Sequence, residues 1–195
     1  MRNDGAEKIT CSLSKALLAT GVILFSAFTL VTHAASQTWI QLSPTDGPPD
    51  ARTLHTSVYR ISSNRMLVFG GAHRLEVGEK LLNDLWVLED ADGTTGTPSW
   101  TQISTESGPS ARSSHTAVYD TNTNSMIVFG GSVGVGSTGS PVLTNEVWVL
   151  ENADATEDDN PLKWTNLSPA EGPSGRAAHT AVYDPSNNRM VVFGG

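Results

Sequence analysis

The chain is poor in cysteine, in basic side chains and in aromatic residues. Its 195 residues include one cysteine, Cys11, and 7% aromatic residues. A single cysteine forms no internal disulfide, so packing has to hold the fold together. Twelve Lys and Arg stand against twenty Asp and Glu, a formal net charge of -8. Such a surface repels nucleic acid and anionic membranes, so neither is an expected partner.

Long apolar runs are also absent, except for one near the N-terminus. Three basic residues precede the uncharged run 16–32, and small residues follow it at 32–34. This order is typical of a signal peptide, which we predict over residues 1–34; an uncleaved N-terminal anchor helix is the alternative. Because the basic residues come first, the remainder is expected outside the cytoplasm, as a secreted, periplasmic or cell-surface protein. A membrane partner is expected only through this segment, if it is uncleaved.

One set of residues returns three times in the rest of the chain. Arg52, Arg112 and Arg176 each lie three residues before a histidine, and each histidine lies 16 residues before the second glycine of a Gly-Gly pair. Tryptophans follow at less regular distances. Constant spacing indicates packed strands, and repeats of this length predict units that must stack to bury their apolar faces. The predicted structural motif comprises His55, His115, His179, Gly70, Gly71, Gly130, Gly131, Gly194, Gly195, Trp39, Trp86, Trp100, Trp148 and Trp164.

The second unit predicts four short β-strands in succession, at 115–119, 125–131, 146–150 and 164–167. The run 125–131 is apolar almost throughout, which indicates a strand that is covered on both faces. A four-stranded antiparallel sheet of this kind needs a similar sheet on each side. We therefore predict an all-β fold built from propeller blades.

These motifs together resemble a known repeat. Arg-x-x-His-Thr-x-Val-Tyr, Met-x-Val-Phe-Gly-Gly, Asn-(Asp or Glu)-x-Trp-Val-Leu and Trp-x-x-(Leu or Ile) are similar to the kelch repeat of β-propellers, particularly in exported bacterial proteins. The resemblance implies an incomplete kelch β-propeller over residues 35–195. It consists of an outer strand at 39–42, blades at 52–103 and 112–167, and a half blade at 176–195.

The predicted strands do not complete a ring. Propellers have about four to eight blades, whereas this chain has two complete units and two strands of a third. Joining the end of one copy to the beginning of another would leave a blade without its third strand, so simple cyclic assembly does not close. We expect the sequence to be the N-terminal part of a longer propeller, in which 39–42 supplies the outer strand of the last blade. An open strand edge is expected at 191–193.

The arginines that begin each unit are candidates for ligand binding. Arg52, Arg112 and Arg176 are expected at the inner end of their blades, where three guanidinium groups suit a carboxylate or sulfate ligand. The alternative, which we favour, is a structural pairing within each blade, because such a pairing recurs in every unit. The partners would then be the acidic residues five or six positions upstream, Asp46, Glu106 and Glu171.

The repeated histidines occupy equivalent places on successive inner strands. A zinc ion needs ligand nitrogens at about 2.0–2.1 Å, and equivalent backbones of adjacent blades lie much farther apart. We therefore predict hydrogen-bonded structural histidines at these positions, and no metal site.

Two further candidate ligand-binding residues, His73 and Arg74, stand outside the repeat. They lie in a charged loop at 72–82, whose counterpart at 132–144 is uncharged and rich in Gly and Ser. Different chemistry at equivalent loops indicates either a recognition surface or ordinary variation between solvent-exposed loops.

The preferred interpretation is an exported interaction module that presents its loops to a protein or glycan ligand, with no cofactor and no catalytic residue. The alternative is a carbohydrate-active propeller enzyme. Exported proteins of the kelch-like kind include copper radical oxidases similar to galactose oxidase and a sialic acid epimerase. The oxidases use a tyrosine cross-linked to a cysteine, whereas residues 35–195 contain no cysteine. An active site would therefore have to lie mostly in blades beyond Gly195.

Overall fold

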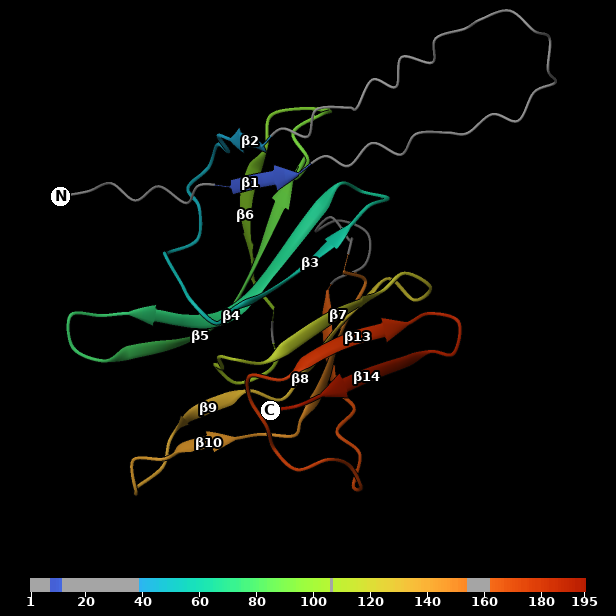
Figure 1. Cartoon of the computed structure of the whole chain (residues 1–195). Helices are drawn as coiled ribbons and strands as arrows, with labels where there is room; N and C mark the ends of the chain where they lie inside the picture. Colours follow the sequence, from blue (N-terminus) through green and yellow to red (C-terminus); the bar gives the residue numbers. More distant parts are fainter. Residues whose placement is uncertain (1–7, 12–38, 106, 154–161) are drawn as a thin grey trace, which may run out of the picture. The chain divides into compact units, whose positions relative to one another are not determined.

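The computed structural model describes residues 8–11, 39–105, 107–153 and 162–195, and every regular element among them is a β-strand (Figure 1). The all-β prediction is thus confirmed. Within these ranges no helix has the length and apolar character needed to cross a membrane. The predicted signal or anchor helix lies, apart from residues 8–11, outside the described residues.

The chain divides into two compact units, residues 1–43 and 44–195. In the first unit, β1 (Lys8–Cys11) pairs antiparallel with β2 (Trp39–Leu42). The strand predicted at 39–42 is therefore present, and β1 is its partner in this structure.

The second unit begins with a four-stranded antiparallel sheet, the first blade. Neighbouring strands follow one another along the chain, so the sheet is a simple meander. The pairing of its two central strands is irregular between Phe69 and Gly71, at the Gly-Gly pair. The four strands are β3 (Thr56–Arg60), β4 (Arg65–Arg74), β5 (Glu79–Glu89) and β6 (Ser99–Ile103).

A second blade repeats this meander and a two-stranded hairpin follows it. The second blade consists of β7 (Thr116–Asp120), β8 (Ser125–Phe129), β11 (Val147–Glu151) and β12 (Lys163–Asn166). The hairpin consists of β13 (Thr180–Asp184) and β14 (Arg189–Phe193). We call it the third hairpin because it belongs to the third unit of the repeat. The innermost strand of the second blade, β7, neighbours both β3 and β13.

The connections predicted as loops at 72–82 and 132–144 are β-hairpins, which corrects that expectation. In the first blade, β4 and β5 themselves continue beyond the Gly-Gly pair. In the second blade a separate pair forms, β9 (Ser132–Val135) with β10 (Pro141–Leu143). Two antiparallel segments joined by a short turn satisfy each other's backbone hydrogen bonds, which a solvent-exposed loop leaves to water.

The turn between the first two strands of each unit is the same in all three copies. An asparagine adopts a positive φ there, a conformation that Asn tolerates better than other residues with a β-carbon. Its side-chain oxygen accepts a hydrogen bond from the tyrosine one residue before the end of the preceding strand. The pairs are Tyr59 with Asn64, Tyr119 with Asn124, and Tyr183 with Asn188.

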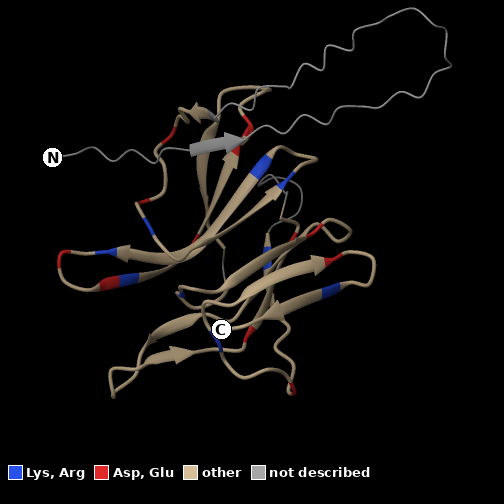
Figure 2. Cartoon of the chain, viewed as in Figure 1, with Lys and Arg blue, Asp and Glu red and all other residues tan. Residues whose placement is uncertain are grey.

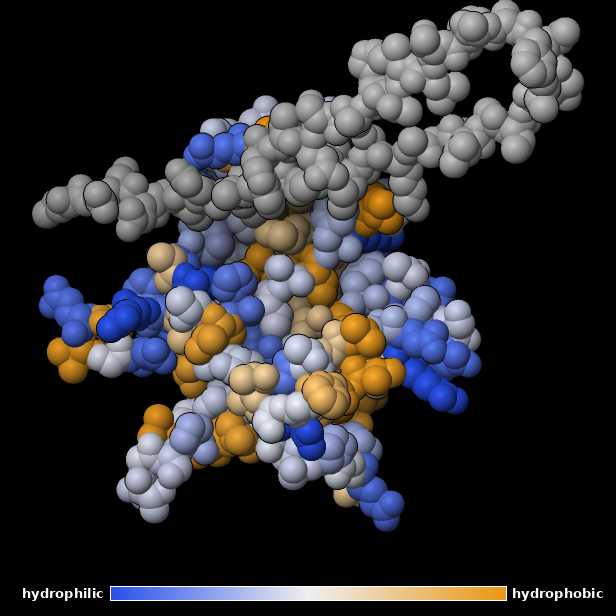
Figure 3. Space-filling view, in the orientation of Figure 1, coloured by the Kyte–Doolittle hydropathy of each residue, from blue (hydrophilic) through white to orange (hydrophobic). Residues whose placement is uncertain are grey.

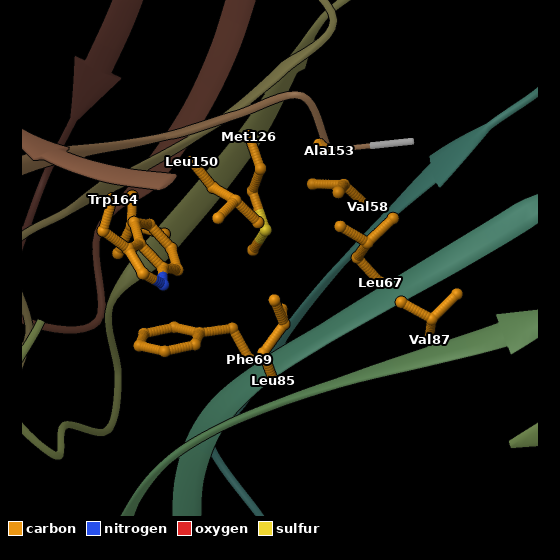
Figure 4. Close-up of a cluster of buried hydrophobic side chains, with 10 residues drawn as sticks. Val58, Leu67, Phe69, Leu85, Val87, Met126, Leu150, Ala153 and Trp164 are labelled. Carbon is orange, nitrogen blue, oxygen red and sulfur yellow. The ribbon is translucent and has the colours of Figure 1, made fainter. Parts of the chain in front are cut away.

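The main hydrophobic core lies between the first and second blades (Figure 4). Phe69 is fully buried, and its ring lies 5.1 Å from that of Trp164, centroid to centroid. Each blade buries against the next blade the apolar side chains that it could not bury alone. The core comprises Val58, Leu67, Phe69, Leu85 and Val87 of the first blade with Met126, Val128, Leu150, Ala153 and Trp164 of the second.

Candidate interaction site

The arginine of each complete blade is bound to a carboxylate of the same blade. Arg52 Nη1 and Nη2 donate to Asp84 Oδ1 and Oδ2 at 2.6 and 2.9 Å, a bidentate ion pair. Arg112 Nη2 lies 2.5 Å from Glu146 Oε2, and the Arg112 side chain is 0% exposed. Each guanidinium also donates to the carbonyl oxygen of the first glycine in its Gly-Gly pair. Both arginines are therefore engaged inside the blade.

The same carboxylates accept a hydrogen bond from a tryptophan two residues later. Trp86 Nε1 donates to Asp84 at 2.7 Å, and Trp148 Nε1 donates to Glu146 at 3.1 Å. Burial raises the pKa of both carboxyls, but the hydrogen bonds from Arg and Trp outweigh it and hold each pKa below its ordinary value. The acid-x-Trp spacing thus supplies the counter-ion for the arginine of the repeat.

The loop carboxylates predicted as partners of these arginines do not fill that role. Asp46 accepts a hydrogen bond from Thr45 Oγ1, Glu171 is exposed, and Glu106 lies outside the described residues. The partner comes from the third strand because its distance from the arginine is set by β-pairing, whereas a loop residue has no such constraint. We therefore place a ligand site elsewhere than at Arg52 and Arg112. Arg176 Nη1 donates to the carbonyl of Gly194 at 2.8 Å.

The histidines join successive blades. His115 Nε2 lies 2.8 Å from Thr56 Oγ1 of the first blade, and His179 Nε2 lies 2.7 Å from Thr116 Oγ1 of the second. The His115 ring also meets Phe69 edge-on, with centroids 5.4 Å apart. Burial, together with the charge of Arg112, lowers the pKa of His115 to about 3. The ring is therefore neutral at physiological pH and serves as a hydrogen-bonding group within the scaffold.

The two glycines of the first and second pairs make two different close approaches. A β-carbon at Gly130 would lie 2.8 Å from the carbonyl oxygen of Arg176, and one at Gly131 would lie 2.8 Å from that of Ser113. Both glycines have positive φ, +68° and +103°, which side chains with a β-carbon rarely adopt. The first glycine admits the backbone of the following unit, and the second admits the backbone of its own unit.

One repeated contact has no signal in the sequence. The residue before each histidine, Leu54, Ser114 or Ala178, has a φ of +55° to +57°. The N–H of Ser114 donates to the carbonyl of Leu54, and that of Ala178 to the carbonyl of Ser114, both at 2.9 Å. These bonds link the three units at their inner strands. Because Leu, Ser and Ala share no side-chain chemistry and none favours this conformation, sequence inspection does not identify the position.

The first hairpin, residues 72–81 of β4 and β5, presents apolar residues at its turn. The N–H of Leu75 donates to the carbonyl of Gly78 at 3.1 Å and closes the turn. Val77 is 91% exposed and Leu75 is 46% exposed. Charged residues flank these two on both strands (Figure 2). An exposed aliphatic pair inside a ring of charges resembles the centre and rim of a protein interface.

The two loop residues singled out from the sequence lie on this hairpin in different roles. His73 Nδ1 is 2.8 Å from the carbonyl oxygen of Ala51, so the imidazole ties the base of the hairpin to the segment before β3. Arg74 is exposed and faces Glu79 in the strand register. The structure thus brings Arg74 close to the turn, where a ligand can reach it, and leaves His73 as an anchor.

The second hairpin, β9 with β10, has the opposite chemistry. It contains no charged residue (Figure 2), and Val135 is 72% exposed on it. Both hairpins follow the second strand of their blades, so they project from the same end of the two blades. One end of the scaffold therefore presents two surfaces of different character.

A cleft of about 340 Å³ lies beside the first hairpin. Trp86 and Asp84 line it, and their polar atoms are already hydrogen-bonded to each other. Four further polar side chains line the cleft and make no side-chain hydrogen bond within the described ranges of the chain. They are Asp50, Lys80, Asn83 and Gln102. In the part of the chain that the structure describes, no three His, Cys, Asp or Glu residues converge to hold a metal ion.

Comparison with known proteins points to one family. A sequence profile of the KLHDC2/KLHL20/DRC7 Kelch-repeats domain matches residues 24–157. Adagio-like protein 3 of Oryza sativa subsp. japonica is 27% identical over 201 residues, which cover 97% of this chain and 28% of that protein. Host cell factor 1 of Homo sapiens is 27% identical over 203 residues, 95% of this chain and 9% of that protein. The chain thus spans less than a third of either relative.

A solved structure is also similar to this chain. The structure of YjhT matches it with a TM-score of 0.41 and 15% sequence identity. The match covers 79% of this chain and 62% of that one.

Proposed function

From the premise that this chain belongs to the kelch-repeat family, we propose that it is an interaction module that binds a protein ligand through the first hairpin. The exposed pair Leu75 and Val77 carries this proposal. The blade beneath the hairpin is a four-stranded sheet whose arginine is bound to a carboxylate of the same blade. Recognition by a loop or turn on a rigid scaffold is a common arrangement.

A pair of matched variants tests the proposal. In the first, Leu75→Ser and Val77→Ser remove the aliphatic centre of the first hairpin. In the second, Val135→Ser removes an exposed aliphatic residue from the second hairpin. Each full-length protein is immobilised, and the proteins it retains from the native host are quantified by mass spectrometry. We expect at least one protein to bind the native chain and the V135S variant but not the L75S/V77S variant.

Equal retention of every protein by all three chains would overturn the assignment of the hairpin. Circular dichroism and the urea midpoint of each variant serve as controls. Both substitutions lie on exposed positions, so we expect the urea midpoints to be unchanged.

A second candidate is a glycan ligand in the cleft beside the first hairpin. Amide, carboxylate and ammonium groups that have no side-chain hydrogen bond to any described residue suit the hydroxyl groups of a sugar. Asn83→Ala with Gln102→Ala would then abolish binding on a glycan array while L75S/V77S would leave it unchanged. A native chain that binds no glycan on such an array counts against this candidate and leaves the protein-binding proposal standing.

We also propose that the chain is exported. The apolar run at 16–32 with its preceding basic residues supports this, because that order directs translocation. Mass spectrometry of the protein from its native cells should find a new N-terminus at Ala35 for a cleaved signal. A chain recovered from the cytosol with its original N-terminus would overturn the proposal.

A further inference from the structure

The cleft beside the first hairpin is lined by residues that do not recur in the second blade. Asp50, Lys80 and Gln102 contribute a carboxylate, an ammonium and an amide to it. At the equivalent positions, counted from the repeated Arg, Asn and Trp, the second blade has Ser110, Val142 and Asn166. Scaffold contacts recur from blade to blade, because neighbouring units pack in the same way. The charges of this cleft are therefore not part of the scaffold.

The equivalent polar side chains of the second blade are engaged within that blade. Ser110 Oγ accepts a hydrogen bond from Arg112 Nη2 at 3.3 Å. Asn166 Oδ1 accepts one from the N–H of Ser168 at 2.8 Å. The side chains that take their places in the first blade make no such bond to any described residue, and they are exposed. The first blade thus leaves these groups accessible to a ligand.

The lining of the cleft favours a cationic group. Asp50 offers a carboxylate, and Asn83 and Gln102 offer amide oxygens. Trp86 lines the same cleft and is only partly buried, and the face of an indole ring attracts cations. The whole chain has a formal net charge of -8, which draws cations towards its surface. Among the described lining residues Lys80 alone is cationic, and its long stem lets the ammonium turn into solvent.

The cleft continues the surface of the first hairpin. Lys80 belongs to both, and Trp86 lies six residues farther along β5. At about 3.3 Å per residue, this part of the strand covers roughly 20 Å. A partner that contacts Leu75 and Val77 therefore reaches the cleft with a short extended segment.

We propose that the cleft receives an arginine side chain of the protein ligand that binds the first hairpin. This inference rests on that proposed ligand and adds a residue by which it is recognised. The guanidinium donates to the carboxylate of Asp50 and to the amide oxygens of Asn83 and Gln102, with its plane against the indole of Trp86. Arginine suits the cleft better than lysine, because its planar group stacks and donates several hydrogen bonds at once. Lys80 repels the guanidinium, so loss of its charge should tighten binding.

Nα-acetyl-arginine N-methylamide is the probe, titrated into the isotope-labelled full chain and followed by NMR. The indole N–H signal of Trp86, identified by its absence in Trp86→Phe, should shift and saturate. We expect Asp50→Asn to weaken binding about tenfold, the size of a lost hydrogen bond between charged groups. Lys80→Gln should tighten it about two- to threefold. The matched control is Asp46→Asn, which removes the same charge four residues away, outside the cleft. It should leave the affinity unchanged.

The opposite effects of D50N and K80Q separate an arginine from other ligands. The same titrations are run with Nα-acetyl-glutamate N-methylamide and with methyl glucoside. An acidic ligand would bind more weakly to K80Q and more tightly to D50N, and a sugar would respond to neither charge with opposite sign. Saturation by either of these probes in place of the arginine probe would overturn the proposal. Equal losses in D50N and D46N, or no saturation by the arginine probe, would also overturn it.

The proteins retained by the immobilised chain give a second readout. Those that L75S/V77S loses should also be retained less by D50N than by D46N. If L75S/V77S loses none, the assignment of the hairpin fails, and the arginine site then stands on the probe titrations alone. If the arginine probe does not bind while L75S/V77S still loses proteins, the arginine site fails and the hairpin assignment stands.

Discussion

The first and third copies of the repeat place the same residues in opposite surroundings. Phe69 of the first blade is 0% exposed, whereas Phe193 of the third hairpin is 83% exposed. Gly70 lies against the backbone of Arg112 in the following blade, whereas no atom of the described residues lies within 4 Å of a β-carbon position at Gly194. Hydrophobic side chains are visible over the third hairpin in Figure 3. They include Val182, Val191 and Phe193.

This difference shows which contacts of the repeat form within one unit and which form between neighbouring units. The Tyr–Asn turn is complete in every copy, because both of its partners lie within one hairpin. Three other residues of the motif make their contacts only with a following blade. They are the phenylalanine, the first glycine, and the threonine whose hydroxyl is hydrogen-bonded to the next histidine. Some residues of the motif therefore stabilise a single unit, and others stabilise the contact between that unit and the next.

The largest difference between the copies is expected at the phenylalanines. Phe69→Ala should lower the free energy of unfolding by about 3–5 kcal/mol, since it leaves a cavity between Trp164 and His115. Phe193→Ala should change it by about 0.5 kcal/mol or less, as expected for an exposed site. Urea unfolding followed by tryptophan fluorescence measures both. Similar losses at the two positions would show that a cover absent from the described residues protects Phe193.

The arginines should give the next largest difference. Arg112→Met removes the partner of a partly buried carboxylate, Glu146, and we expect a loss of about 2–3 kcal/mol. Arg176→Met removes no ion pair among the described residues and should cost less than about 1 kcal/mol. The same urea titration compares them. Glu146→Gln should also destabilise the chain, and adding it to Arg112→Met should cause little further loss, because both changes remove the same ion pair.

A smaller contrast is expected at the first glycine of the pair. Gly130→Ala and Gly194→Ala both place a β-carbon at a positive φ, which costs about 1–2 kcal/mol in each. Only at Gly130 does that carbon also meet the carbonyl of Arg176, at 2.8 Å. We expect Gly130→Ala to be the more destabilising by about 1–2 kcal/mol. Equal losses would show that the φ restriction alone accounts for this glycine.

The smallest effect concerns acid pH and His115. Its pKa falls from 6.5 to about 3 on folding, so the unfolded chain binds the proton first as the pH drops. Stability should therefore decrease from about pH 6.5 towards pH 3 and level off below that. The expected loss between pH 7.5 and 5.5 is about 1.4 kcal/mol. His115→Gln should flatten this part of the curve, above the pH at which Asp84 and Glu146 titrate. An unchanged slope in H115Q would contradict the assignment.

Much of the fold follows from residue types and spacing in the sequence. The positions of the strands, the Asn turns and the stacking of units can be predicted because each depends on neighbouring residues or on a repeated count. The partner of Arg112 was harder to identify, since a nearby acid in the sequence and a distant one across a strand look equally suitable. The contact through Leu54, Ser114 and Ala178 could not be predicted, because it is made by the backbone in a conformation that these side chains do not favour.

The sequence by itself determined the kelch repeat, the all-β architecture and the residues that recur in every blade, because local periodicity and turn chemistry are enough to specify them. Only the tertiary structure decided what those residues do. It paired Arg52 and Arg112 with acids in or directly before the third strand, and it placed His115 and His179 in hydrogen bonds with the preceding blade. It also extended the predicted loops into hairpins, and among the described residues it paired β14 with β13 alone. These outcomes depend on distances between residues far apart in the chain, and such distances are set when strands pair and blades stack.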